Sequence, residues 1–236
     1  MSELGTGATP PPDVDLDRVW IGVAAQVWRR QPGPVERTAG RLLRSPGLAR
    51  ALLTTPSLLL PWLIASAAVL AAGTVATRGT GQPLVALLAP VVAGSGIAYA
   101  YGPGIDPAWE LSRSMAVSDR MVLLVRALAV FAVNAALGLA ASAASGTAAA
   151  LTFGWLIPMT AVCALSLAAA TAVRSPNAGV AAGVAGWTIT LLSGQAATGE
   201  FTSVLSRSAL VPAYVGTAIV CAAVVAYATR IPKGTA

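Results

Sequence analysis

The side chains that could carry chemistry are few in this chain of 236 residues, and they fit no common catalytic design. Ser95 stands between Gly94 and Gly96, a setting that could expose a serine nucleophile, but the sequence has no histidine to act as its base. A serine–lysine pair would have to use Lys233 in the C-terminal tail. Every aspartate lies outside the long apolar runs, so no pair of aspartates stands within one. We therefore expect that the chain is not an enzyme.

Metal and nucleotide chemistry also find little support. Cys163 and Cys221 both lie inside apolar runs, where we expect small buried residues and not a metal pair or a disulfide. The phosphate-binding pattern G-x-x-x-x-G-K-[ST] does not occur in the sequence. The sequence thus predicts no metal site and no cofactor in this chain, and any ATP hydrolysis linked to it would take place in another protein.

Apolar runs dominate the chain, with 56% hydrophobic and 10% charged residues, whereas a typical soluble protein has about 25% charged residues. Crossing a hydrocarbon core of about 30 Å takes about 20 helical residues. The runs are continuous and rich in Ala, Leu, Val and Gly, which predicts helices and not membrane β-strands. The predicted fold class is an all-α polytopic membrane protein with six transmembrane helices, at about 55–77, 82–102, 121–143, 147–172, 178–198 and 209–229.

The basic residues predict the orientation of these spans. Apart from Arg78 and Arg207, every lysine and arginine lies in the N-terminal arm, at or near the second and fourth links, or in the C-terminal tail. Cytoplasmic segments of membrane proteins collect such residues, so we expect both termini in the cytoplasm and the chain in a bacterial plasma membrane. The same bias accounts for the net charge of +6 without a nucleic acid partner.

The N-terminal arm predicts a tail followed by an interfacial helix. Residues 1–13 are rich in Gly, Thr and Pro and predict a disordered tail. From position 14 to 30, apolar residues recur at helical spacing. Trp20 and Trp28 lie on the apolar side, and Arg29 and Arg30 close the segment, a pattern typical of a helix in the membrane interface.

A second helix is expected in the rest of the arm, which extends over residues 14–54. Arg37, Arg41 and Arg44 are spaced at i, i+4 and i+7 and form a basic stripe. Two interpretations stay open: an anchor to anionic lipid, or a lever that joins the spans to a cytoplasmic partner. The transmembrane domain follows at 55–229, and a cytoplasmic tail at 230–236.

The link between the second and third spans is the longest and most polar on the cytoplasmic side. Asp106 followed by proline is a typical helix start and predicts a short helix over about 106–118. Trp109 would face the membrane or a partner, and Glu110 and Arg113 lie one turn apart. A simple reversal of the chain needs only a few residues. We therefore expect these four side chains to form a docking surface for a partner.

The order of elements resembles the membrane subunits of ABC exporters of the second exporter class: an interfacial N-terminal helix, six spans, and an acidic-then-basic helix between the second and third. In that family the second link carries a glutamate, then a small residue or proline, an aliphatic residue and a serine before a basic third span. Glu110, Ala116, Val117, Ser118 and Arg126 follow that order. Two features depart from it: alanine stands where proline is frequent, and the N-terminal arm is longer than in many members.

The resemblance implies a permease that works as a homodimer or heterodimer of membrane subunits. Separate ATP-binding cassette ATPase subunits would hold the ATP and Mg. The helix over 106–118 would be the coupling helix seated in the ATPase. The interfacial helix, with Trp20, Trp28, Arg29 and Arg30, would transmit the motion.

Two further segments carry expectations. Residues 199–208, between the last two spans, resemble the family's short external re-entrant element, with a plain amphipathic loop as the alternative. Gly179 and Gly183 form a GxxxG pair, which brings helices close either within the chain or at a dimer interface.

Ionisable residues are scarce inside the spans, which disfavours ion coupling and suits an apolar or amphipathic substrate. Two other functions remain open on the sequence: a membrane-embedded regulatory or scaffold protein without transport, and a secondary transporter or channel.

Overall fold

A computed structural model describes residues 15–29, 33–42, 44, 56–99, 119–146 and 153–229 of the chain. Within these residues all regular structure is helical. The elements are α1 (Leu16–Arg29), α2 (Pro34–Leu42), α4 (Pro56–Thr80), α5 (Leu84–Tyr99), α7 (Asp119–Ser145), α9 (Leu156–Val173), α10 (Pro176–Thr198), α11 (Ser203–Ser206), the 3-10 helix η1 (Ser208–Leu210) and α12 (Val211–Ala228).

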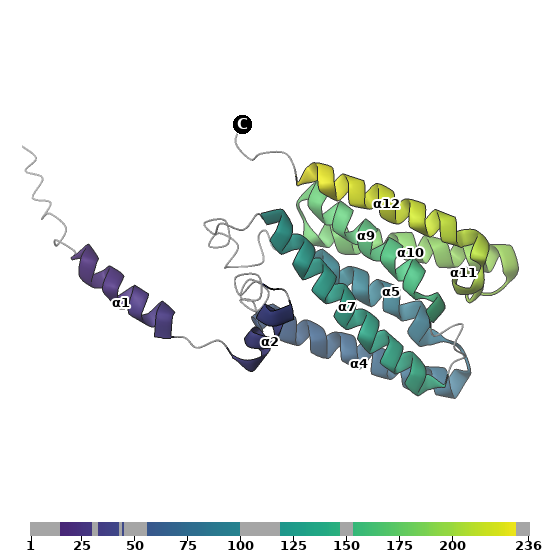
Figure 1. Cartoon of the computed structure of the whole chain (residues 1–236). Helices are drawn as coiled ribbons and strands as arrows, with labels where there is room; N and C mark the ends of the chain where they lie inside the picture. Colours follow the sequence, from purple (N-terminus) through teal and green to yellow (C-terminus); the bar gives the residue numbers. More distant parts are fainter. Residues whose placement is uncertain are drawn as a thin grey trace, which may run out of the picture.

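Six helices, namely α4, α5, α7, α9, α10 and α12, lie side by side in a bundle, and α1 lies apart from it (Figure 1). Their directions alternate along the chain, so α5, α9 and α12 end on the side of the bundle where α4, α7 and α10 begin (Figure 1). Helix α9 packs against α5, α10 and α12, and α5 packs also against α4, α7 and α10. The centre of the bundle is α9: 56% of its membrane-length segment is buried, against 11% in α10 and in α12.

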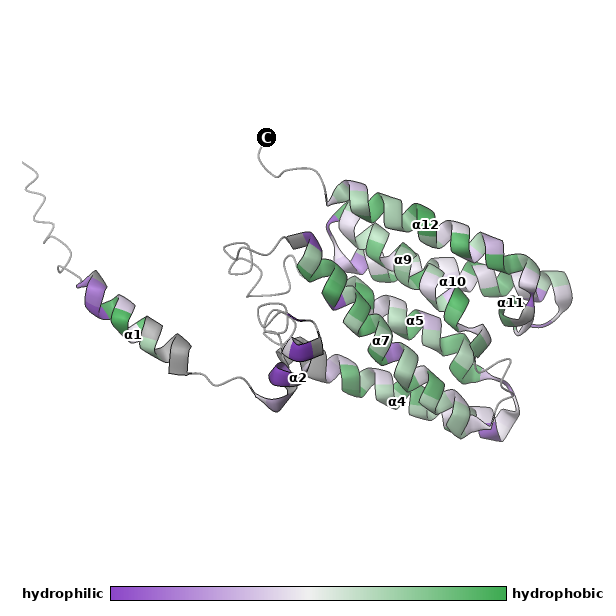
Figure 2. Cartoon of the chain, viewed as in Figure 1, coloured by the Kyte–Doolittle hydropathy of each residue, from purple (hydrophilic) through white to green (hydrophobic). Residues whose placement is uncertain are grey.

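The all-α membrane fold is confirmed for five of the six predicted spans. Helices α4, α7, α9, α10 and α12 are long and apolar enough to cross a membrane, and hydrophobic residues dominate the bundle in Figure 2. The described part of α5 has 16 residues, about 24 Å at a rise of 1.5 Å per residue, which is shorter than a full span. The second predicted span, 82–102, and the orientation of the bundle therefore stay predictions.

The fourth predicted span differs from the observed helix. A continuous helix was expected from about 147, but α9 begins at Leu156, after a turn at Trp155. Pro158 stands in the first turn of α9, where its missing N–H leaves no hydrogen bond of the helix unmade. Residues 147–152 lie outside the described part of the chain. Composition concealed this boundary because the apolar run passes through it.

The core is built from bulky side chains set among small ones. Trp155, Trp187 and Met159 are among the largest fully buried side chains. Cys163 and Cys221 are both buried and both free, as the sequence predicted. The interior around α9 is thus filled by its own side chains.

Candidate functional site

The predicted docking helix lies outside the described residues. Asp106, Trp109, Glu110 and Arg113 all fall in the segment between α5 and α7, and their docking role stays a prediction. The ends of the two flanking helices are described: α5 ends at Tyr99 and α7 begins at Asp119, on the same side of the bundle (Figure 1). The segment that contains the predicted coupling helix therefore joins two helices at that side.

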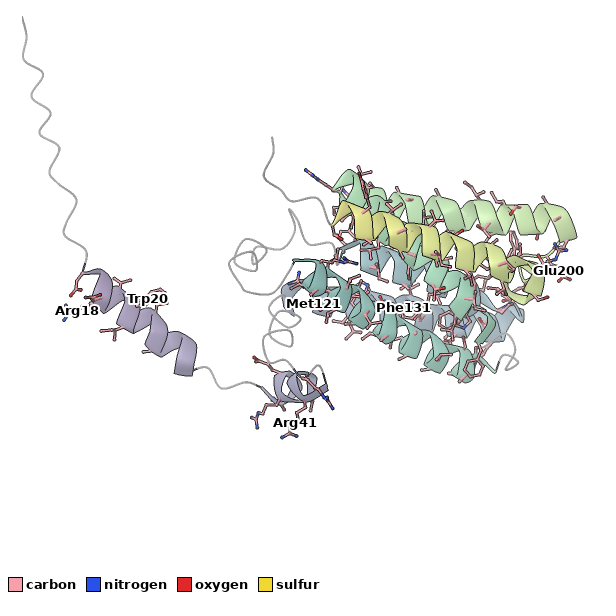
Figure 3. The ribbon with its side chains drawn as sticks, turned by 45° about the horizontal axis from the view of Figure 1, so that its top comes forward. Arg18, Trp20, Arg41, Met121, Phe131 and Glu200 are labelled. Carbon is pink, nitrogen blue, oxygen red and sulfur yellow. The ribbon has the colours of Figure 1, made fainter. Side chains whose placement is uncertain are left out.

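Helix α1 has the amphipathic character that the sequence predicted. The side chain of Asp15 accepts a hydrogen bond from the backbone N–H of Arg18 at 3.1 Å, which caps the first turn. Four apolar side chains of α1 are exposed, with Trp20 at 72% (Figure 3): Val19, Trp20, Ile21 and Val23. Such a surface is suited to a headgroup interface, where an indole is half in apolar surroundings and half in water.

The other members of the predicted lever are only partly described. Trp28 and Arg29 form the last two residues of α1, so the helical backbone reaches them. Arg30 lies outside the described residues. The structure therefore supports a helix of about the predicted extent. The role of Arg29 and Arg30 in transmitting motion stays a prediction.

Among the described residues, the buried polar side chains include several hydroxyls, the amide of Asn134 and the guanidinium of Arg126. Arg126, in the third turn of α7, is 9% exposed, and Asn134 is 2% exposed. The amide of Asn134 donates to the carbonyl of Val130 at 2.9 Å, one turn earlier in the same helix. Among the described residues of the six bundle helices, the single acidic residue is Asp119, at the start of α7. The described interior thus offers no carboxylate midway along a helix that could relay a proton.

The GxxxG pair of α10 is used inside the chain. A Cβ added at Gly179 would meet the carbonyl oxygen of Ser166 at 2.6 Å and the Cβ atoms of Ala170 and Ala98 at 2.8 and 2.9 Å. A Cβ added at Gly183 would overlap with the hydroxyl of Ser166. The two glycines therefore let α10 approach α9 and α5 closely. Of the two uses that the sequence left open, the geometry supports packing within the chain, and the dimer interface stays a prediction.

Tryptophans join the helices at two further close contacts. Trp62 of α4 lies on Gly96 of α5, and a Cβ added at Gly138 of α7 would meet the ring of Trp155 at 2.5 Å. Both contacts bring an indole against bare backbone, which only glycine allows. The indole nitrogens of Trp62 and Trp155 are buried and have no hydrogen-bond partner, so these two rings act by filling volume.

Trp187 makes a polar contact that the sequence analysis missed. Its indole nitrogen donates to the backbone carbonyl of Leu87 at 2.8 Å and so ties α10 to α5. Pro90 has no N–H, so the carbonyl of α5 that lacks its helical donor is that of Ala86, four residues earlier. The Trp187 bond falls on the next carbonyl, that of Leu87, and is an additional contact between the two helices. Nothing in the two apolar runs singled out this pair.

The segment between the last two bundle helices folds back on the bundle. Val204 and Leu205 of α11 are buried, and a Cβ at Gly194 of α10 would overlap with the Val204 side chain. The phenol of Tyr214 donates to the carbonyl of Val204 at 3.2 Å. The segment 199–208 thus contains a short helix, Ser203–Ser206, that packs on the bundle. Whether it enters a membrane stays a prediction.

At the same end, side chains of α4 donate to backbone carbonyls of α7. Thr74 donates to the carbonyl of Ala141 at 3.3 Å. The guanidinium of Arg78 donates to the carbonyl of Ala144 through Nε, at 3.1 Å, and through a terminal nitrogen. The bonds to Ala144 satisfy one of the last carbonyls of α7, which have no partner within the helix.

The described residues thus form a packed six-helix bundle and a separate amphipathic helix, α1. Among them we find no cluster of catalytic side chains. No protein-family model, curated protein or solved structure matches this chain.

Proposed function

We propose that this chain is the permease subunit of an ATP-driven ABC exporter and couples to separate ATP-binding subunits through the helix predicted at 106–118. The observation that carries the proposal is the packed helix α11 between the last two bundle helices, together with the amphipathic α1 ahead of the first. A membrane anchor alone would need neither element. Both are features that the resemblance to this exporter class implies.

The filled interior of the bundle favours a substrate path outside the single bundle, and its apolar outer surface favours an apolar or amphipathic substrate. Trp155, Trp187 and Met159 are fully buried around α9, so the middle of the bundle is filled by its own side chains. Helices α10 and α12 are long and apolar, and most of their residues are not buried within the bundle. On this proposal the substrate moves along a surface shared by two membrane subunits, each of which acts as a rigid wall.

The test begins with purification of the chain from its native membrane in a mild detergent, followed by identification of co-purifying proteins by mass spectrometry. The proposal expects an ATP-binding subunit in stoichiometric amount. A signalling partner would favour the regulatory or scaffold function, and transport activity by the chain without an ATPase would favour a secondary transporter or channel.

Substitution Glu110→Arg then tests the docking helix. We expect this change to abolish stimulation of the ATPase by the permease while expression and monodispersity stay unchanged, because the reversed charge opposes docking. The matched control is Glu200→Arg, which reverses an exposed acid at the opposite end of the bundle (Figure 3) and should leave the stimulation intact. Equal stimulation in both variants would contradict the docking role.

A further inference from the structure

Helix α2 carries a basic surface that the proposed transport role does not use. Arg37 and Arg41 lie one turn apart on α2 and are both exposed. At about 100° per residue they are separated by about 40° around the helix, so they share one side. Arg44 follows in the turn that ends α2, with its N–H 3.4 Å from the carbonyl of Arg41, and it is also exposed. Figure 2 shows α2 as a strongly hydrophilic element.

This segment has a net positive charge. Residues 33–44 contain three arginines and one acid, Glu36. The segment therefore presents a positive surface to whatever covers it, and the complementary partner is anionic.

Two neighbours of α2 favour a lipid surface as this partner. Helix α1 precedes α2 in the chain and exposes the apolar side that contains Val19, Trp20 and Val23. Helix α4 follows and is long and apolar enough to cross a membrane, so α2 is tethered to that membrane within at most about 50 Å of extended chain. Stable attachment to a membrane surface commonly combines apolar insertion with basic residues, and the two helices supply one component each.

We propose that Arg37, Arg41 and Arg44 bind the phosphate groups of anionic lipids in the leaflet next to α2, while α1 inserts its apolar side into the same leaflet. Each guanidinium offers a planar fork of donors that matches phosphate oxygens. Each cation near an anionic surface strengthens attachment about fivefold. The contact holds α1 and α2 at the membrane and depends on lipid charge, and it does not depend on the identity of any ATPase.

The experiment compares the full-length chain in nanodiscs of phosphatidylcholine and in nanodiscs that also contain phosphatidylglycerol. Hydrogen–deuterium exchange is followed by mass spectrometry in peptides that cover α1 and α2. With phosphatidylglycerol we expect exchange in α2 to slow by about tenfold or more, and high salt should reverse part of the effect because exposed charges are screened. Equal exchange in the two membranes would overturn the proposal.

Variants and a soluble anion identify the source of the effect. The triple substitution R37Q/R41Q/R44Q should remove the dependence on phosphatidylglycerol, whereas R37K/R41K/R44K should keep most of it because the charge remains. Unchanged exchange in peptides from α4 to α12 shows that each variant is folded. Inorganic phosphate added to phosphatidylcholine nanodiscs should have little effect. Full protection by phosphate alone, or protection that survives the glutamine substitutions, would refute the proposed lipid contact.

Discussion

Replacing Gly183 by alanine should destabilise the bundle, and replacing Ser166 by alanine in the same chain should restore it. The new Cβ at position 183 would overlap with the Ser166 hydroxyl. That hydroxyl is completely buried and has no hydrogen-bond partner. Its removal leaves the Cβ of residue 166 at 3.4 Å from the new methyl group, an ordinary van der Waals contact.

Three contributions determine the expected changes in the free energy of unfolding. Overpacking of a tight interface costs about 1–3 kcal/mol, and alanine in a helix gains up to about 1 kcal/mol over glycine, so Gly183→Ala alone should cost about 1–2 kcal/mol. Ser166→Ala removes an unsatisfied buried hydroxyl and should be neutral or stabilising. The double variant should therefore be at least as stable as the original chain, with a coupling energy of about 1–2 kcal/mol.

The assay is reversible unfolding in mixed micelles by increasing sodium dodecyl sulfate, followed by circular dichroism. Gly216→Ala is the matched control, because Gly216 lies in α12 and a Cβ there has open space around it. The control should be neutral or slightly stabilising. Additive effects of the two substitutions would refute the packing of α10 on α9. A loss of stability that depends on protein concentration, without rescue at position 166, would instead place Gly183 in a dimer interface.

Three more predictions test other contacts. Trp187→Phe should lower the free energy of unfolding by about 1 kcal/mol or slightly more, because it deletes the hydrogen bond to the α5 backbone. Trp155→Phe should lack this loss of a hydrogen bond, because the indole nitrogen of Trp155 has no partner. Unfolding in mixed micelles measures both variants, and an equal loss from hydrogen bonding in the two would contradict this prediction. Tyr214→Phe should raise hydrogen exchange in α11 severalfold without a comparable change in α9, since the phenol holds an α11 carbonyl; uniform exchange across the bundle would contradict it. A cysteine at position 112 in place of Ser112 should react with an impermeant label only from the cytoplasmic side, and labelling from outside would reverse the predicted orientation.

The positions of the helices could be predicted because long apolar runs and prolines are visible in one sequence. Pro176 and Pro212 stand at the starts of α10 and α12, close to the predicted boundaries. The start of α9 could not be predicted, because the composition is uniform across the turn at Trp155. In a soluble protein the amphipathic pattern would indicate the buried side of each helix. Here lipid and core are both apolar, so that signal is weak.

For the same reason the sequence did not reveal which helices touch. The contact of Trp187 with Leu87 links residues 100 positions apart, and neither residue is exceptional within its own run. The GxxxG pair was recognisable, but whether it served α9 or a second copy depended on the shapes of the facing surfaces. The arm was easier to interpret, because its charged and apolar residues recur at helical spacing.

The central position of α9 has a consequence for how the protein is made. A ribosome releases α4, α5 and α7 into the membrane first, but much of what holds α5 in place, namely α9 and α10, has not yet been synthesised. Helix α12 emerges last and packs mainly on α9. The nascent chain therefore passes through a stage in which α5 is in the membrane without α9 and α10. The contacts of α9 are complete only after α12 has packed on it.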